Sequence, residues 1–209
     1  MPCDPRAGKA SADLVAELFS AQSAITPFDG ALLERAGVPR FLIDDGMIAA
    51  GSITVRSDGT YDLDPDGARA YITPCRVGDP STPEAIGFEV VPQFGNLVDL
   101  VAWHPRRPHR WALRRGAGSW LGAIPPQLCD PPPVPIRRSP MSWLRAGATG
   151  LCPLDHDALG IWRVLNVCRS LQAEDPNHAR ELRRALERPF PIPPITVPAA
   201  RRRVGANHA

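Results

Sequence analysis

Residues 47–77 read MIAAGSITVRSDGTYDLDPDGARAYITPCRV, and this stretch decides the fold that the sequence predicts. Met47–Arg56 is rich in small and β-branched residues and predicts a strand. Ser57–Thr60 (SDGT) predicts a hairpin turn, because Asp-Gly readily adopts the backbone that joins two antiparallel strands. Tyr61–Leu63 is then the short returning strand.

Further strands are predicted after this hairpin. Ala68–Val77 is expected to form one, with Pro74 at an edge or a bulge because proline has no N–H for the ladder. Leu97–Trp103 (LVDLVAW) is the strongest strand, and Arg110–Arg114 and Ser119–Ile124 are expected to pair with each other. The hairpin spacing favours an antiparallel sheet of five or six strands.

Helices are predicted before and after the sheet. Residues 11–24 show helical periodicity and a second helix is expected over 29–36, stopped by glycine and proline. The apolar stripe of the first helix consists of Leu14, Val15, Leu18 and Phe19. A short helix is expected at 140–147, and helices at 156–172 and 176–188 would form a C-terminal helical hairpin. The predicted class is therefore α+β, with an N-terminal helix, an antiparallel sheet and a C-terminal helical hairpin.

Proline suggests how the chain is divided. The 25 prolines are about twice the usual share of roughly 5%, and they cluster at 131–135 and 189–198. Proline-rich stretches favour extended connections over packed elements. The expected segments are an α+β domain over 1–130, a proline-rich linker over 131–140, a helical segment over 141–188, and a flexible Pro/Arg tail over 189–209.

Composition predicts a cytoplasmic protein with no membrane attachment. Hydrophobic residues make up 44% and charged residues 22%, which is typical of a globular chain. The sequence has no run of 18 apolar residues, and Met1–Arg6 lacks the basic-then-apolar order of a secretory signal. The five cysteines are widely spaced without a CxxC pair, which favours free thiols in a reducing compartment.

Charge is divided unequally along the chain. Residues 1–100 hold 7 Lys+Arg and 15 Asp+Glu, a balance of −8, whereas residues 101–209 hold 17 and 7, a balance of +10. Such asymmetry indicates nucleic acid or another anionic surface as partner of the basic half. Two arrangements would need no such partner: the two halves could neutralise each other in the fold, or copies of the chain could associate head to tail.

The basic half contains a segment rich in arginine and tryptophan, WHPRRPHRWALRRGAGSW over 103–120. Single-stranded nucleic acid needs cations along its phosphates and aromatic rings on which its bases stack. The residues predicted to bind it here are Arg106, Arg107, Arg110, Trp111, Arg114 and Arg115. The alternative is that Trp103, Trp111 and Trp120 are core residues and the arginines stack on their edges.

The last predicted helix carries a second candidate interface. Arg180 and Arg184 lie one turn apart, opposite the apolar positions Ala179, Leu182 and Leu186. With the preceding helix this segment could form a helix-turn-helix whose second helix enters a groove. The alternative is a helical hairpin packed on the sheet, with solvated arginines.

Other motifs carry weaker signals. Asp62–Gly67 (DLDPDG) begins like a calcium loop, but its twelfth position is Thr73 where a bidentate acid is needed. Cys152 and His156 could form a thiol nucleophile with its base. The chain has no phosphate-binding loop, zinc-protease motif or nucleophile elbow. No cofactor, metal ligand or catalytic residue is therefore assigned, and the sequence favours a binding protein over an enzyme.

Three stretches are similar to uncharacterised proteins of prophages and integrated mobile elements in GC-rich bacteria. They are Leu97–Pro105 (LVDLVAWHP), Arg110–Gly122 (RWALRRGAGSWLG) and Arg138–Gly147 (RSPMSWLRAG). The resemblance implies a role near DNA and carries no assigned activity.

These observations predict a nucleic-acid-associated binding module, for DNA or RNA, of a mobile genetic element. The first alternative is a protein–protein adaptor or inhibitor of a host factor that acts through the acidic N-terminal half. The second alternative is a small hydrolase or transferase that uses Cys152 and His156.

Overall fold

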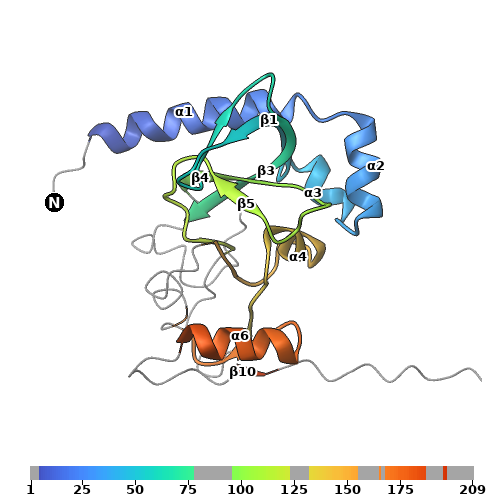
Figure 1. The fold of residues 1–209 in the computed structure, drawn as a ribbon, viewed down its shortest axis with the longest axis vertical. Helices are drawn as coiled ribbons and strands as arrows, with labels where there is room; N and C mark the ends of the chain where they lie inside the picture. Colours follow the sequence, from blue (N-terminus) through green and yellow to red (C-terminus); the bar gives the residue numbers. More distant parts are fainter. Residues whose placement is uncertain are drawn as a thin grey trace, which may run out of the picture.

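A computed structural model of the chain describes residues 5–77, 96–122, 132–154, 165, 168–186 and 195–196. Its centre is a five-stranded antiparallel sheet in the order β2-β1-β3-β4-β5 (Figure 1). The strands are β1 (Ala49–Val55), β2 (Tyr61–Leu63), β3 (Ala68–Val77), β4 (Asn96–Trp103) and β5 (Trp111–Leu113). The predicted α+β class and the antiparallel sheet are confirmed.

The β1–β2 hairpin forms where the Asp-Gly turn predicts it. Ile53 of β1 pairs with Leu63 of β2 on one side and with Ala68 of β3 on the other. The chain therefore crosses from one side of β1 to the other between β2 and β3. Gly67 lies at this crossing, and a Cβ there would come within 2.4 Å of the Ile53 carbonyl oxygen, so only glycine fits.

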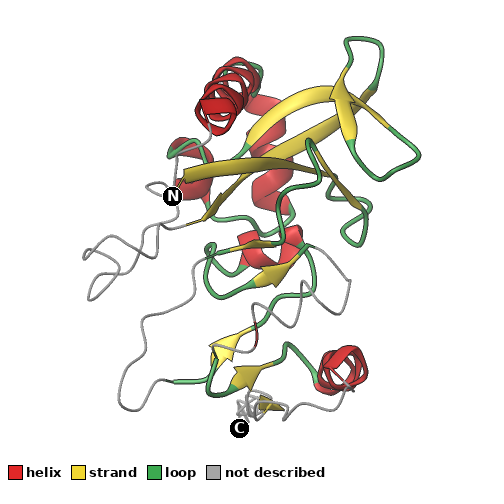
Figure 2. Cartoon of the chain, turned by 90° about the vertical axis from the view of Figure 1, so that its left-hand side faces the viewer, coloured by secondary structure: helices red, strands yellow, loops and turns green. Residues whose placement is uncertain are grey.

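The sheet is strongly curled, as Figure 2 shows. Thr60, next to β2, forms a bridge with Leu113 of β5, and the Leu113 N–H donates to the Gly59 carbonyl at 3.4 Å. This contact joins the two ends of the strand order. The curl therefore gives the sheet one concave face.

Pro74 lies in β3, a strand in the interior of the sheet, where proline is rarely tolerated because it has no N–H for the ladder. β3 lies between β1 and β4, but the pairing with β1 ends at Ile72, so Pro74 has a strand neighbour only on the β4 side. A bulge follows between Cys75 and Arg76. Pro74 therefore lies where β3 is locally an edge, directly before a bulge, in agreement with the predicted positions.

Helix α1 (Pro5–Gln22) packs across β1 and β4. Leu14, Leu18 and Ala21 are buried against the sheet, whereas Val15 and Phe19 are 36% and 66% exposed. The predicted four-residue stripe is therefore only half right. A single helix on a curled sheet buries one narrow row at i, i+4, and the neighbouring positions face solvent.

The other face of the sheet is covered by α2 (Pro27–Arg35), α3 (Arg40–Asp44) and α4 (Pro140–Arg145). α2 begins with a capping box in which Thr26 and Asp29 exchange hydrogen bonds. Their shared core with the sheet consists of Leu33, Val38, Leu42, Tyr71, Val101, Trp103, Met141, Trp143 and Leu144, among others. Two helical layers thus enclose the sheet.

The chain after β5 departs from the predicted pairing. β5 pairs with β4, and β6 (Trp120–Leu121) pairs instead with β8 (Cys152–Pro153). The expected hairpin between 110–114 and 119–124 is therefore wrong. The reason is Asp99, a fully buried carboxylate that accepts backbone N–H groups from the intervening loop and holds it against β4.

The C-terminal part forms a smaller cluster of its own. β7 (Val134–Pro135), β9 (Leu171–Gln172) and β10 (Ile195–Thr196) make a parallel sheet, and α6 (Pro176–Leu186) packs beside it. Val134 and Ile136 are buried although the sequence placed them in a linker, and residues 171–172 are a strand where a helix was expected. Most of the predicted 156–172 helix lies outside the described residues, so the helical hairpin and the segment boundaries stay predictions.

No helix in the described part of the chain combines the length and the apolar character needed to cross a bilayer.

Candidate nucleic-acid interface

The loop between β4 and β5 consists of two consecutive turns set by proline. The Arg107 N–H donates to the His104 carbonyl at 2.9 Å, and the Arg110 N–H donates to the Arg107 carbonyl at 3.0 Å. Pro105 and Pro108 each occupy the second position of their turn, where the fixed φ of proline is favoured. The backbone of the loop is therefore preorganised before any ligand binds, and its side chains project from defined positions.

Three cations of this loop are available to a ligand. Arg106, Arg107 and Arg110 are exposed, and none of them forms an ion pair with a described carboxylate. Unpaired arginines on a constrained loop suit phosphate groups, because the guanidinium can donate two parallel hydrogen bonds to one anion.

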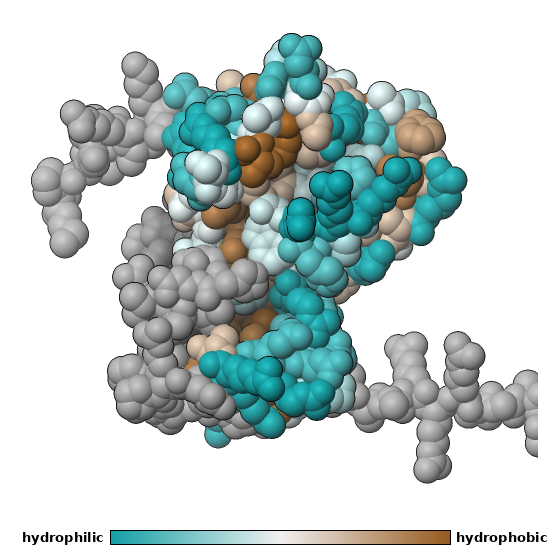
Figure 3. All heavy atoms as spheres, viewed as in Figure 1, coloured by the Kyte–Doolittle hydropathy of each residue, from teal (hydrophilic) through white to brown (hydrophobic). Residues whose placement is uncertain are grey.

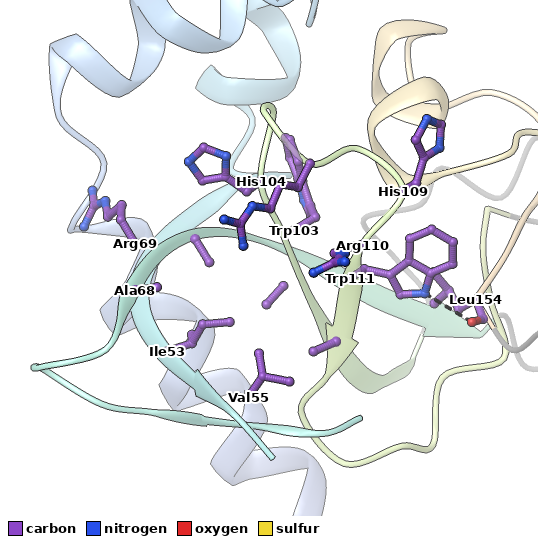
Figure 4. Close-up of a pocket in the computed structure, with 14 residues that line it drawn as sticks. Ile53, Val55, Ala68, Arg69, Trp103, His104, His109, Arg110, Trp111 and Leu154 are labelled. Carbon is purple, nitrogen blue, oxygen red and sulfur yellow. Dashed lines mark hydrogen bonds between the residues drawn. The ribbon is translucent and has the colours of Figure 1, made fainter. Parts of the chain in front are cut away.

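Arg107 and Arg110 border a hollow of about 980 Å³ at the concave side of the sheet (Figure 4). Its lining comes from β1, β3, β4, β5, the 104–110 loop and Leu154. Arg69 and His104 lie at one end of the hollow, and His109 and Trp111 lie at the other. Among the described residues, the lining contains three arginines and two histidines and no carboxylate, so the site attracts anions.

Short side chains create the hollow. Ala68 and Ala70 of β3, Ala102 of β4 and Ala112 of β5 line it, and Ala102 pairs directly with Ala112 across the strands. Ala70, Ala102 and Ala112 are themselves buried beside Leu100 and Ile72, whereas Ala68 is exposed at the floor of the hollow. Ile53 and Val55 of β1 complete an apolar floor. The face of the molecule seen in Figure 3 is mainly hydrophilic, with an apolar area exposed over the sheet.

Arg69 is held in place by a buried carboxylate. Its guanidinium donates to Asp29 at 2.7 Å and to the Ala24 carbonyl at 2.8 Å, and the Tyr71 hydroxyl donates to the same carboxylate at 2.9 Å. Burial raises the pKa of Asp29, but hydrogen bonds from Thr26, Arg69 and Tyr71 outweigh it and lower the pKa to about 2. Asp29 thus positions one wall of the hollow and offsets part of the Arg69 charge.

This arrangement predicts an acid-dependent loss of stability. The folded-state pKa of Asp29 lies below its ordinary value of 3.8, so its stabilising effect is present above about pH 4 and is lost as the pH falls towards 2. We expect Asp29→Asn to lower the free energy of unfolding by about 2–3 kcal/mol at pH 6 and by much less at pH 2. Urea unfolding of both proteins across this range measures the gap, and a gap that does not change with pH would contradict the assignment.

His104 is a neutral donor at the rim of the hollow. Its Nδ1 accepts the Arg106 backbone N–H at 3.1 Å, so the ring proton of the neutral form is on Nε2. Burial lowers the pKa of His104, and the charges of Arg106 and Arg107 lower it further. The imidazole is therefore uncharged at neutral pH and contributes one N–H to a ligand.

The tryptophans of the 103–120 segment have different surroundings. Trp103 is 2% exposed and its Nε1–H donates to Thr73 at 2.9 Å, so it belongs to the core, as the alternative interpretation expected. Trp120 packs against the C-terminal cluster. Trp111 is half-buried, donates from Nε1 to the Leu154 carbonyl at 3.1 Å and lines the hollow. Of the three rings, Trp103 and Trp111 both line the hollow, and Trp111 is the more exposed of the two.

Two predicted arginines are engaged inside the fold. Arg114 donates to both oxygens of Glu17 at 2.9 and 3.0 Å and to Asp62 at 3.3 Å, and these contacts raise its pKa. Arg115 lies 4.0 Å from Asp13. The acidic and basic halves therefore neutralise each other at this point, and Arg114 is a structural residue that ties α1 to the sheet.

Arg180 and Arg184 are exposed on α6, but they do not join the hollow. Figures 1 and 2 place α6 at the opposite end of the molecule from the five-stranded sheet. The buried side of α6 consists of His178, Ala179, Leu182 and Leu186, in agreement with the predicted apolar stripe. The structure therefore separates the two arginine groups that the sequence combined.

The acidic surface proposed for a protein partner is largely used within the fold. Asp62 is paired with Arg56 at 2.6 Å, Asp64 accepts from Thr54 at 2.6 Å, and Asp58 closes its own turn through Thr60. Among the described side chains, no group of three or more acids, histidines or cysteines is arranged to hold a metal ion.

Cys152 is not placed for catalysis. Its side chain is completely buried, and burial raises the pKa of the thiol well above its ordinary value. His156, its proposed base, lies outside the described residues. A thiolate nucleophile needs a lowered pKa and access to substrate, so these properties of Cys152 oppose the hydrolase alternative.

No protein-family model, curated protein or solved structure matches this chain. The site is therefore defined by its geometry alone.

Sequence reasoning found the cations of the 104–110 loop but missed the floor of the hollow. The alanines come from three strands, and no motif links them along the chain. The backbone of the loop did have a signal in the sequence. Pro105 and Pro108 lie three positions apart in HPRRPHR, and this spacing predicts two successive turns from which the arginines project.

Proposed function

We propose that this protein binds single-stranded nucleic acid at the hollow between the curled sheet and the 104–110 loop. The partner is DNA or RNA, and the setting is a mobile genetic element, as the sequence resemblance implies. Arg106, Arg107 and Arg110 follow the phosphates, while Arg114, Arg115, Arg180 and Arg184 are left out of the central interface.

The observation that carries this proposal is the charge of the hollow. Arg107 and Arg110 line it without a carboxylate partner in the described part of the chain, and none of its described lining residues is an acid. Backbone turns fix the loop from which these side chains project, so binding needs little ordering of the loop backbone. A phosphodiester chain matches such a row of cations better than an acidic protein surface does, because its charges repeat at every nucleotide.

Fluorescence anisotropy with labelled oligo(dT) and oligo(U) tests the proposal. At physiological salt we expect a Kd of about 1–100 μM, the range typical of binding without sequence preference, and tighter binding at low salt. Three arginine–phosphate contacts on a single strand predict a slope of about −2 in a plot of log K against log salt concentration. A Kd weaker than about 100 μM even at low salt, or binding that does not respond to salt, would overturn the proposal.

A further inference from the structure

The hollow is larger and more apolar than phosphate binding requires. Its volume of about 980 Å³ is at the upper end of the range usual for ligand pockets. Phosphate contacts need only the arginines at its border, yet behind them lies a floor formed by Ala68, Ala70, Ala102 and Ala112 with Ile53 and Val55. An apolar recess next to cations fits a ligand that joins a flat apolar group to an anion.

A nucleotide has this combination of groups. Its base is flat and carries polar atoms only on its edge, and its phosphate lies one sugar away. The neutral His104 presents Nε2–H at the rim, and Trp111 borders the opposite end. The short side chain of Ala68, exposed beside Val55, leaves room for a ring to lie against the strands, and the N–H of His104 can donate to an oxygen or nitrogen on the base edge.

We propose that the alanine-floored hollow takes unpaired nucleobases, so that the protein selects single strands over duplexes. This inference rests on the proposed function and adds the chemical group that the hollow recognises, an unpaired base. A base inside a duplex is stacked and paired, and it cannot enter the recess without being separated from its partner. The arginines supply affinity for any phosphate chain, and the hollow supplies the preference for an accessible base.

Titration with three probes of equal length separates base recognition by the hollow from phosphate binding by the arginines. The probes are oligo(dT) of about 12 nucleotides, an abasic oligomer with the same phosphates, and a duplex. We expect oligo(dT) to bind at least about tenfold more tightly than the abasic oligomer and the duplex, because base contacts of this kind contribute about that factor. Equal binding of oligo(dT) and the abasic oligomer would overturn the base site and leave phosphate binding intact. Failure of all three to bind would overturn the proposed function itself.

A variant that fills the hollow gives an independent test. Ala68 is exposed at the floor, so Ala68→Leu adds volume there without changing the charge or the buried core. We expect it to weaken oligo(dT) binding about tenfold and to leave the abasic oligomer unaffected. Ala16→Leu, the same change at an exposed site on α1 away from the hollow, is the matched control and should bind like the unaltered protein.

The outcomes of the variant test are decisive in both directions. A loss confined to oligo(dT) supports the base site. Unchanged binding of oligo(dT), or an equal loss for the abasic oligomer, overturns it. If Ala68→Leu unfolds, Val55→Phe replaces it, because Val55 also lines the hollow and is 57% exposed.

Discussion

Replacing Asp99 by alanine is expected to lower the free energy of unfolding by about 4 kcal/mol, a loss that few single substitutions cause. Asp99 is completely buried in the middle of β4. One of its carboxylate oxygens accepts the backbone N–H groups of Leu100 and Arg115 at 2.8 and 2.9 Å. The other accepts those of Ala117 and Gly118 at 2.7 and 3.0 Å.

The expected loss in the free energy of unfolding follows from the four backbone N–H groups that alanine would leave without an acceptor. Hydrogen bonds to a charged acceptor contribute about 1.5–3 kcal/mol each, and the four are not additive because they share one carboxylate. The loop also packs closely, since a Cβ at Gly118 would lie 3.0 Å from the Cys75 sulfur and 3.1 Å from the Asp99 Cβ. Water therefore has little room to replace the lost acceptor.

Urea unfolding monitored by tryptophan fluorescence measures the effect, with two comparison variants. Asp99→Asn keeps one oxygen but turns an NH2 group towards two of the donors, so we expect a smaller loss of about 2–3 kcal/mol. Asp66→Ala removes an exposed carboxylate that accepts no hydrogen bond from a described residue and should change stability by less than about 0.5 kcal/mol. A similar small change at Asp99 would show that the loop does not depend on its carboxylate.

Reversing the charge of Arg107 and Arg110 together is expected to weaken oligo(dT) binding more than about 100-fold at low salt. The double substitution to glutamate removes two cations and places two anions in a hollow whose described lining has no acid. Both side chains are exposed and lack ion pairs with described residues, so the stability of the fold should stay nearly unchanged. Anisotropy titration measures binding, and thermal unfolding of the same samples checks the fold.

The matched control carries the same change in net charge at the other arginine pair. Arg180→Glu with Arg184→Glu alters α6, which lies at the far end of the molecule from the sheet (Figure 1). The two double variants are compared at about 0.1 M salt, where distant charges are largely screened, and there we expect the control to bind within about threefold of the unaltered protein. Equal losses in the two double variants would mean that net charge, and not the hollow, governs binding.

Local sequence patterns predicted the sheet well where strands and turns adjoin. The Asp58-Gly59 turn, the strand over 68–77 and the strand over 97–103 each depend on side chains close together in the chain. The same reasoning failed for β6, because its partner Cys152–Pro153 is thirty positions away and the contact depends on the loop held by Asp99. An acid in the apolar run LVDLVAW was the available signal for this buried acceptor.

The candidate site also combines features that local sequence predicted with features that depend on residues far apart in the chain. Composition and spacing predicted a basic segment and singled out Arg106, Arg107 and Arg110, but they could not separate these from Arg114. The difference lies in Glu17, almost a hundred residues earlier, which meets Arg114 only because α1 crosses the sheet. The sequence also grouped Arg180 with these residues, and the fold separates them.

By itself, the sequence determined the α+β class, the β1–β2 hairpin and the position of the arginine-rich loop, because these depend on propensities and spacings within a few residues. The tertiary structure alone decided which arginines keep their charge for a ligand and where a hollow forms. Charge neutralisation and cavity shape depend on residues that are distant in the chain and become neighbours only when the sheet curls and the helices pack on it.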